Sequence, residues 1–172
     1  NILRDMKCKK LTANLYYNEN AENDTNFSKD KHRYLDATTI IEKEGVKIGI
    51  IGLSTPMSAQ FEEDTGYLND FYFVSPIKEA QKQIKKLKEE GANAIVVVAH
   101  MGIENENGIP ETGVRDLANA VPEIDVIVAG HMHQNIPKEI INGVLITEPH
   151  RYGTFVSEVD LKFEITGKNV CL

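Results

Sequence analysis

Three of the five histidines in the chain directly follow apolar runs that are typical of buried β-strands. His100 follows residues 94–99, and His131 and His133 follow residues 125–129. In an open parallel sheet, ligands collect at the carboxyl ends of the strands, and neutral imidazole is a common ligand for zinc, manganese and iron ions. The pattern therefore predicts a metal site at one edge of a sheet. The alternative is that three polar residues simply cap strand ends.

The spacing of His131 and His133 indicates how many metal ions the two side chains would bind. On extended backbone, side chains two positions apart point to opposite sides, so we expect His131 and His133 to address two adjacent ions. His100 can join one of them, and Gly130 would let the backbone approach closely. Two metal ions about 3.5–4 Å apart are a recurring device for phosphoryl hydrolysis. His150 is left outside the ligand set, although it also follows a β run.

Length and composition indicate one globular domain over residues 1–172, with 41% hydrophobic and 26% charged residues. No apolar run approaches the roughly 18 residues of a membrane helix. The first residues include neither an initiator methionine nor a signal-peptide core, so we expect a processed or excised piece, and its location is unknown from this evidence. The two cysteines, Cys8 and Cys171, are expected to be free thiols rather than a disulfide.

The net charge of −7 argues against a nucleic-acid polymer as partner, because no basic stripe is available. The negative net charge does not exclude a small phosphorylated substrate, since a bound divalent metal can make the local electrostatic potential positive. The lysines at 82, 85, 86 and 88 are expected to form a solvated helix face, which Glu79, Glu89 and Glu90 balance.

The elements that must position the histidines form strand–helix–strand crossovers. A helix is predicted from Ser75, which can cap it, to Gly91, which suits its C-terminal end. A shorter helix is expected over residues 112–120, between the strands at 94–99 and 125–129.

Antiparallel pieces are expected around this core. Hairpins are predicted at residues 37–51 and at residues 138–147, where Asn142-Gly143 is a strong turn signal. The alternating residues 155–163 predict a half-buried antiparallel strand, with Phe155 among the inward positions. Residues 11–17 are expected to be a strand. Residues 18–31 are predicted to be a surface loop, closed by an exposed His32.

Two further patterns have competing explanations. Residues 60–73 are expected to be a loop whose aromatic side chains pack on the domain, with stacking on a substrate base as the alternative. Gly49 and Gly52 could belong to a nucleotide-binding loop, but the third glycine is missing and Pro56 prevents a helix from starting on schedule. Close backbone packing is the preferred explanation for these glycines.

Two blocks resemble a known family. Residues 96–102 (Val-Val-Val-Ala-His-Met-Gly) and 128–134 (Val-Ala-Gly-His-Met-His-Gln) are similar to the last two metal-binding motifs of calcineurin-like metallophosphoesterases. The similarity is greatest to the 5′-nucleotidase and 2′,3′-cyclic-nucleotide 2′-phosphodiesterase branch. Residues 45–56, 11–14 and 152–153 match further segments of that branch.

The resemblance implies half of an α/β/β/α sandwich, with a mixed sheet, crossovers and antiparallel hairpins. It implies two divalent ions, zinc, manganese or similar, with His100 and His131 on one ion and His133 on the other. It also implies hydrolysis of nucleotide phosphoesters, either 2′,3′-cyclic nucleotides or 5′-monophosphates, by metal-activated hydroxide. A secreted, periplasmic or cell-wall location would follow from the family.

The same resemblance predicts that the first half of the catalytic domain and a C-terminal substrate domain are missing. The Asp-x-His, Gly-Asp and Gly-Asn-His motifs of that first half are all expected to be absent from this chain. No catalytic residue is therefore assigned, and the isolated chain is expected to turn over slowly or not at all. Exposed apolar sheet surface would favour self-association. The competing hypothesis is a non-catalytic α/β module with a structural or adventitious metal.

Overall fold

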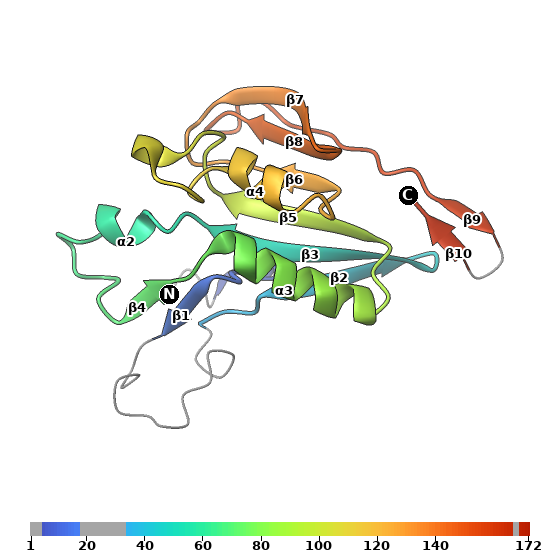
Figure 1. The fold of residues 1–172 in the computed structure, drawn as a ribbon, viewed down its shortest axis with the longest axis horizontal. Helices are drawn as coiled ribbons and strands as arrows, with labels where there is room; N and C mark the ends of the chain where they lie inside the picture. The colour runs from blue at the N-terminus through green and yellow to red at the C-terminus, as the bar shows by residue number, and fades with distance from the viewer. Residues whose placement is uncertain (1–4, 18–33, 167–168) are drawn as a thin grey trace.

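The computed structural model describes residues 5–17, 34–166 and 169–172. A six-stranded mixed sheet forms its body, in the order β2-β3-β5-β6-β8-β7 (Figure 1). The strands of this sheet are β2 (Thr38–Lys43), β3 (Val46–Ser54), β5 (Ala94–His100), β6 (Val126–Val128), β7 (Asn135–Ile141) and β8 (Val144–Pro149). The surface loop predicted at residues 18–31 and the exposed His32 lie outside the described residues.

The centre of the sheet is parallel, as the crossover pattern predicts. β3 pairs with β5, β5 with β6 and β6 with β8, all in parallel. The crossovers run through α3 (Pro76–Glu89) and α4 (Val114–Ala120), which lie on the same face of the sheet (Figure 1). The expected α/β class is confirmed.

The start and end of α3 also follow the sequence signals. The Ser75 side chain accepts a hydrogen bond from the Lys78 N–H at 3.2 Å, and Pro76 occupies the first turn. Gly91 has a φ of +87°, the left-handed conformation typical of a residue just beyond a helix C-terminus.

The hydrophobic core lies between these helices and the sheet. Side chains along each strand point alternately to the two faces of the sheet, and those that face the helices form the core. Paired positions on neighbouring parallel strands therefore lie side by side in it. The fully buried members include Ile51, Val97, Ile127 and Ile146 from the sheet and Leu87 and Leu117 from the helices.

Both hairpins occur where they are predicted. Glu44 and Gly45 join β2 to β3, and Asn142 and Gly143 join β7 to β8, with positive φ at all four positions. Positive φ at both central residues matches the right-handed twist of the flanking strands. The register of β7 against β8 shifts between Ile136 and Glu139.

Residues 60–73 are not the continuous loop that the sequence predicts. They include part of α2 (Ser58–Phe61) and all of β4 (Phe71–Phe73), which pairs with the short β1 (Leu15–Tyr17). β4 has only three residues, and its pairing depends on a partner far away in the chain, so the local pattern does not reveal it. The predicted packing of the aromatic rings is confirmed only in part, because Tyr72 stacks on Tyr16 with ring centroids 5.6 Å apart, whereas Tyr67 is 79% exposed.

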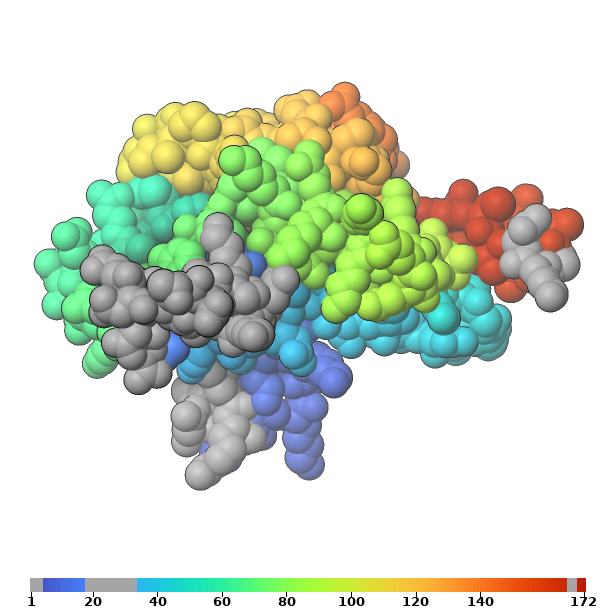
Figure 2. Space-filling view, turned by 60° about the horizontal axis from the view of Figure 1, so that its bottom comes forward, coloured from blue at the N-terminus to red at the C-terminus, as the bar shows by residue number. Residues whose placement is uncertain are grey.

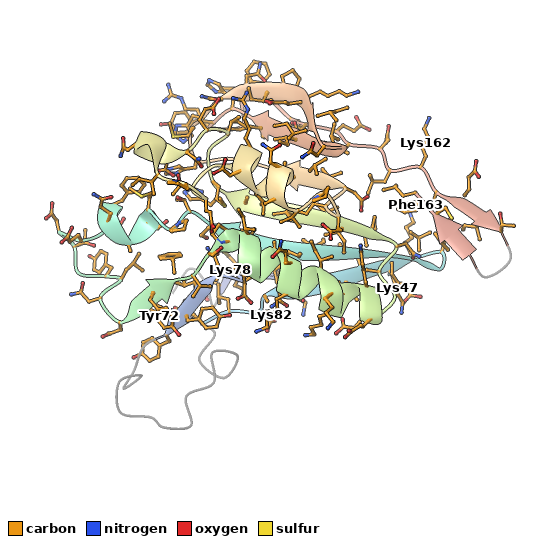
Figure 3. All side chains as sticks on the ribbon, viewed as in Figure 1. Lys47, Tyr72, Lys78, Lys82, Lys162 and Phe163 are labelled. Atoms are coloured by element: carbon orange, nitrogen blue, oxygen red, sulfur yellow. The ribbon has the colours of Figure 1, made fainter. Side chains whose placement is uncertain are left out.

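The predicted strand over residues 155–163 is wrong. This part of the chain forms no strand, and the only strands after it in the described residues are β9 (Glu164–Thr166) and β10 (Asn169–Cys171). They form a hairpin that projects from the body of the molecule (Figures 1 and 2). The alternation itself partly persists, since Lys162 is exposed and Phe163 half-buried (Figure 3), but Phe155 is exposed. Alternation of apolar and polar residues determines which side chains face the core, but a strand also needs a neighbouring backbone with which to form hydrogen bonds.

Gly49 and Gly52 serve close packing, as preferred from the sequence. A Cβ at Gly49 would lie 2.9 Å from Leu87 Cδ1 of α3, and one at Gly52 would overlap the backbone of Leu11. On α3 the predicted lysine face is exposed, and Lys78 and Lys82 project from the same helix (Figure 3). Glu79 balances Lys82 as predicted, with its Oε1 atom 3.9 Å from the Lys82 Nζ atom, but it is buried and also accepts a hydrogen bond from the Tyr16 hydroxyl at 2.9 Å.

Cys8 and Cys171 are both free and exposed, which confirms the expectation of two thiols. No helix within the described ranges is long and apolar enough to cross a membrane.

Asp125, just before β6, links the start of that strand to β5. Its Oδ2 accepts the Ile95 N–H at 2.6 Å, and burial raises the pKa of this carboxyl, although the Ile95 N–H and Lys88 oppose the rise. The folded state therefore holds the Asp125 proton more tightly than the unfolded state does. That contribution to stability is complete below the unfolded pKa, about 3.9, and is lost as pH rises through the folded pKa.

We expect the variant Asp125→Asn to gain stability relative to the wild type as pH rises from about 4 to neutrality. The asparagine keeps an acceptor for the Ile95 N–H and has no charge to desolvate. Urea unfolding of both proteins across this pH range measures the difference. A difference that is constant with pH would contradict the expectation.

Candidate metal centre

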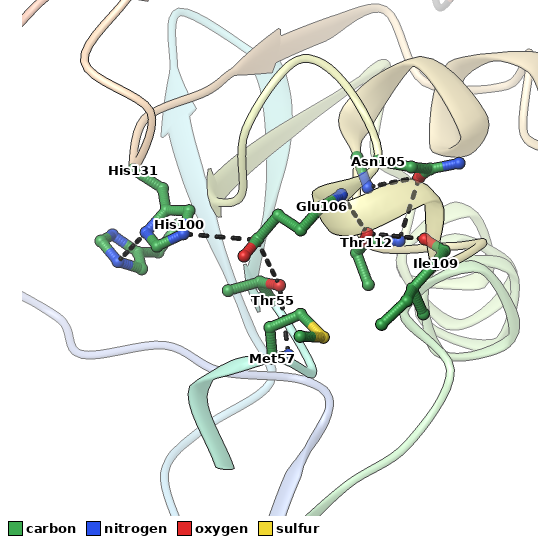
Figure 4. Close-up of polar contacts among 9 residues, drawn as sticks. Thr55, Met57, His100, Asn105, Glu106, Ile109, Thr112 and His131 are labelled. Carbon is green, nitrogen blue, oxygen red and sulfur yellow. Dashed lines mark hydrogen bonds and ion pairs between the residues drawn. The ribbon is translucent and has the colours of Figure 1, made fainter. Parts of the chain in front are cut away.

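His100 and His131 meet at the carboxyl edge of the parallel sheet. His100 is the last residue of β5, and His131 follows the neighbouring β6 after Ala129 and Gly130. The Nδ1 atom of His131 lies 3.1 Å from the Nε2 atom of His100, and the two ring centroids are 4.8 Å apart (Figure 4). The crossover topology produces this meeting, because parallel neighbours end at the same edge.

The separation of these two nitrogens fits two ligands of one ion. Zinc–imidazole bonds of about 2.0–2.1 Å in tetrahedral geometry place two ligand nitrogens roughly 3.3 Å apart. The donor chemistry also fits, because burial and the neighbouring His131 lower the pKa of His100 and so favour its neutral, ligating form. Across the described ranges, however, no group of three or more His, Cys, Asp or Glu side chains is arranged to hold an ion by itself.

Glu106 is a site residue that sequence reasoning missed. It begins η2 (Glu106–Gly108) in the loop after β5, and it is only 8% exposed. Its Oε1 atom lies 3.3 Å from Nε2 of His131 and accepts a hydrogen bond from the Thr55 hydroxyl at 2.9 Å (Figure 4). Glu106 therefore contacts the nitrogen of His131 that faces away from His100.

The loop that carries Glu106 is held by several side chains. The Thr112 hydroxyl accepts the Glu106 N–H at 2.8 Å and donates to the Ile109 carbonyl (Figure 4). Asn105 Oδ1 accepts the N–H groups of Thr112 and Gly113. The sequence of this loop is rich in Gly, Asn and Glu residues, a composition typical of a solvated surface loop. Composition alone therefore does not indicate that the Glu106 carboxylate is buried.

His131 and His133 do not lie on extended backbone. Their φ angles are +77° and +58°, so the reason given for separating their side chains is wrong. Their neighbours nevertheless differ, since the His133 ring lies 5.9 Å from the Tyr152 ring. A Cβ at Gly130 would meet no protein atom closer than the Ala99 carbonyl oxygen at 3.9 Å, so the close backbone approach to an ion stays a prediction.

A second buried carboxylate supports the histidine loop from β8. Glu148 is fully buried, and its Oε1 atom accepts the Gln134 N–H at 2.9 Å, while its Oε2 atom has no hydrogen-bond partner. Burial raises the pKa of this carboxyl, and hydrogen bonds from the Gln134 and His133 backbone oppose that rise. His150 lies two residues after Glu148, and its Nδ1 contacts the Thr154 hydroxyl at 3.2 Å.

Phe61 covers one face of the His131 ring. The two ring centroids are 5.7 Å apart with an interplanar angle of 27°. This aromatic residue was predicted only to pack on the domain, and the structure adds that it packs on a candidate ligand. Stacking of this kind restricts rotation of the imidazole.

One motif of the resembled family does occur in the chain. Residues 30–32 form an Asp-x-His triplet, Asp30-Lys31-His32, so the expected absence of all first-half motifs is too broad. The triplet lies outside the described residues.

Comparison with known proteins places the chain in a family. A family profile described as "Bacterial capsule synthesis protein PGA_cap" matches residues 28–157. The chain is 38% identical over 139 residues to the protein named Endonuclease YhcR of Bacillus subtilis, covering 80% of this chain and 11% of that protein. It is 30% identical over 154 residues to a 5′-nucleotidase of Vibrio cholerae, covering 76% of this chain and 28% of that protein.

A solved structure shows the same fold. The calcineurin-like phosphoesterase YfkN of Bacillus subtilis matches with a TM-score of 0.71 and 24% identity, covering 93% of this chain and 52% of that one. The chain thus spans a small part of the curated relatives that it matches. It belongs to the PGA_cap family, and its relatives confirm the resemblance to calcineurin-like phosphoesterases of the 5′-nucleotidase type.

Proposed function

We propose that this chain is one part of a metal-dependent enzyme that hydrolyses nucleotide phosphoesters. The observation that carries the proposal is the pairing of His100 and His131 at the carboxyl edge of the sheet, in a chain whose relatives are nucleotide phosphoesterases. These two histidines would hold one divalent ion, and His133 would contribute to a second. Bound divalent ions would stabilise the negative charge that develops during phosphoryl transfer.

The chain's own residues would position the ligands. His100 reaches the site from the end of β5, and its lowered pKa keeps a lone pair available at neutral pH. Phe61 and Glu106 restrict His131 from two sides. We assign no general acid and no bridging carboxylate to the described residues.

The substrate class and the remaining groups are inferred from the relatives. We propose a 2′,3′-cyclic nucleotide or a nucleoside 5′-monophosphate as substrate, with the bridging carboxylate and the base-binding domain in other parts of the natural protein. The chain spans 11% of YhcR and 28% of the Vibrio cholerae 5′-nucleotidase, which leaves room for both. An extracytoplasmic location stays a prediction from the family.

Metal binding and turnover together test this proposal. We expect the purified 172-residue chain to bind Mn²⁺ or Zn²⁺ weakly in calorimetry, and to hydrolyse nucleotides or p-nitrophenyl phosphate slowly or not at all. Hydrolysis at ordinary enzymatic rates would contradict the assignment of missing groups. Failure to bind any divalent ion would favour the non-catalytic α/β module.

One face of the sheet is available for a partner. Val98 is 49% exposed although it lies on the central strand β5, and Ile41 on β2 is 54% exposed. Both line a largely apolar groove of about 600 Å³, together with Ile50 and Leu11. Parallel strands are normally buried on both faces, so we propose that this face packs against another part of the protein or against a second copy.

We expect the chain to form dimers or larger species, and Val98→Lys to shift it toward the monomer because a charge there opposes burial of the face. Light scattering over a range of concentrations measures the shift. The control Ile165→Lys places the same charge at an exposed position on β9 and should leave the association unchanged. A wild-type chain that is monomeric at every concentration would contradict the expectation.

A further inference from the structure

The buried Glu106 carboxylate has a place in the site that the proposed ligand set does not include. We propose that Glu106 is a positioning residue, whose carboxylate lies against Nε2 of His131, favours the proton on that nitrogen and so leaves the Nδ1 lone pair of the ring facing His100. The inference rests on the proposed function, in which His100 and His131 share an ion. Its evidence is a set of contacts around one imidazole.

The first step concerns which nitrogen of His131 carries the proton. Glu106 Oε1 lies 3.3 Å from His131 Nε2, and an ionised carboxylate can only accept hydrogen bonds. In the neutral imidazole, the adjacent carboxylate therefore favours the proton on Nε2, which leaves the lone pair on Nδ1. That lone pair faces His100 Nε2, 3.1 Å away.

The second step concerns His100 before and after metal binding. If Nδ1 of His131 is the acceptor, then His100 Nε2 must donate the proton between the two rings in the metal-free chain. An ion bound by both nitrogens would require His100 to hold its proton on Nδ1 instead. Glu106 would thus favour one tautomer of His131 throughout, while His100 would have to change its tautomer for both nitrogens to hold an ion.

The third step is that the carboxylate is built into the fold rather than drawn in by the histidine. Thr55 follows β3 and donates to Glu106 Oε1, and the Thr55 N–H donates to the His100 carbonyl at 3.0 Å. The Thr112 hydroxyl accepts the Glu106 N–H. Thr55 therefore holds the Glu106 oxygen and Thr112 holds the Glu106 backbone, and a buried carboxylate needs such partners to be tolerated.

A carboxylate on the far nitrogen of a ligating histidine orients the ring and raises its basicity, and its loss typically weakens metal binding about 10–100-fold. Glu104 provides a contrast in the same loop. It is exposed and pairs with Arg115, so removing its charge should not affect His131.

The test compares Glu106→Leu, which keeps much of the volume but has no acceptor, with Glu106→Gln, which keeps an acceptor oxygen. Glu104→Gln is the matched control. Long-range ¹H–¹⁵N correlation spectra of the metal-free chain measure the tautomer of His131, and calorimetry with Mn²⁺ or Zn²⁺ measures affinity. Circular dichroism melting identifies variants that do not fold.

We expect Glu106→Leu to lose the uniform Nε2–H form of His131 and to bind metal about 10–100-fold more weakly, and Glu106→Gln to recover most of both. Glu104→Gln should match the wild type. If Glu106→Leu does not fold, Thr55→Val, which removes only the supporting hydroxyl, should change both readouts in the same direction by less.

An unchanged tautomer and an unchanged affinity in Glu106→Leu, or in Thr55→Val where that variant is needed, would overturn the inference. A changed tautomer in a chain that binds no metal would support the positioning contact and contradict the proposed function. A wild type that binds metal while the variants bind it equally well would contradict the positioning role alone.

Discussion

Replacing His131 with alanine is expected to weaken binding of a divalent ion by more than roughly 100-fold. The change removes a direct ligand, and loss of a mere supporting contact typically weakens binding 10–100-fold. His100→Ala should have an effect of similar size, because the two nitrogens face the same position. The double variant should bind little more weakly than either single variant, since one ligand alone holds the ion poorly.

His150 provides the control for this experiment. It also lies at the carboxyl edge of the sheet, but its ring contacts Thr154 and Phe155 rather than the histidine pair. His150→Ala should bind metal as the wild type does. Calorimetry with Mn²⁺ or Zn²⁺ measures the wild type and these four variants, and unchanged metal content in a His131→Ala/His133→Ala variant would reject the site.

Gly52→Ala is expected to destabilise the fold by about 1–3 kcal/mol or more, the range typical of overpacking. A Cβ at this position would overlap the backbone of Leu11, which cannot move away as a flexible side chain would. The same backbone region is tied down, because the Gly52 carbonyl accepts the Ala13 N–H at 2.7 Å. Relieving the overlap would therefore disturb this hydrogen bond.

Gly130→Ala is the matched control, since a Cβ there would be in ordinary contact at 3.9 Å. Urea unfolding should show Gly52→Ala clearly less stable than the wild type and Gly130→Ala close to it. Equal stability of the two variants would contradict the account of close packing at Gly52.

Local signals predicted much of the fold because they act within a few residues. Ser75, Pro76 and Gly91 define α3 through capping and backbone conformation, and Asn142-Gly143 defines a hairpin through its positive φ angles. The meeting of His100 and His131 followed from topology, since parallel neighbours end at one edge. These predictions needed no knowledge of distant contacts.

The features that sequence reasoning missed depend on contacts between distant segments. β4 exists because it pairs with β1, more than fifty residues earlier. Residues 155–163 alternate like a strand but have no pairing partner within the described ranges. Glu106 is functional only because Thr55 and His131 approach it from two other parts of the chain.

The central claim is that His100 and His131 bind one divalent ion through the nitrogens that face each other. A Zn²⁺ titration followed by the ring ¹⁵N signals of the histidines tests it most directly. The account predicts that Nε2 of His100 and Nδ1 of His131 shift together to values typical of coordination, while His150 does not change. Signals of His100 and His131 that stay unchanged at saturating Zn²⁺, or that shift no more than those of His150, would contradict it.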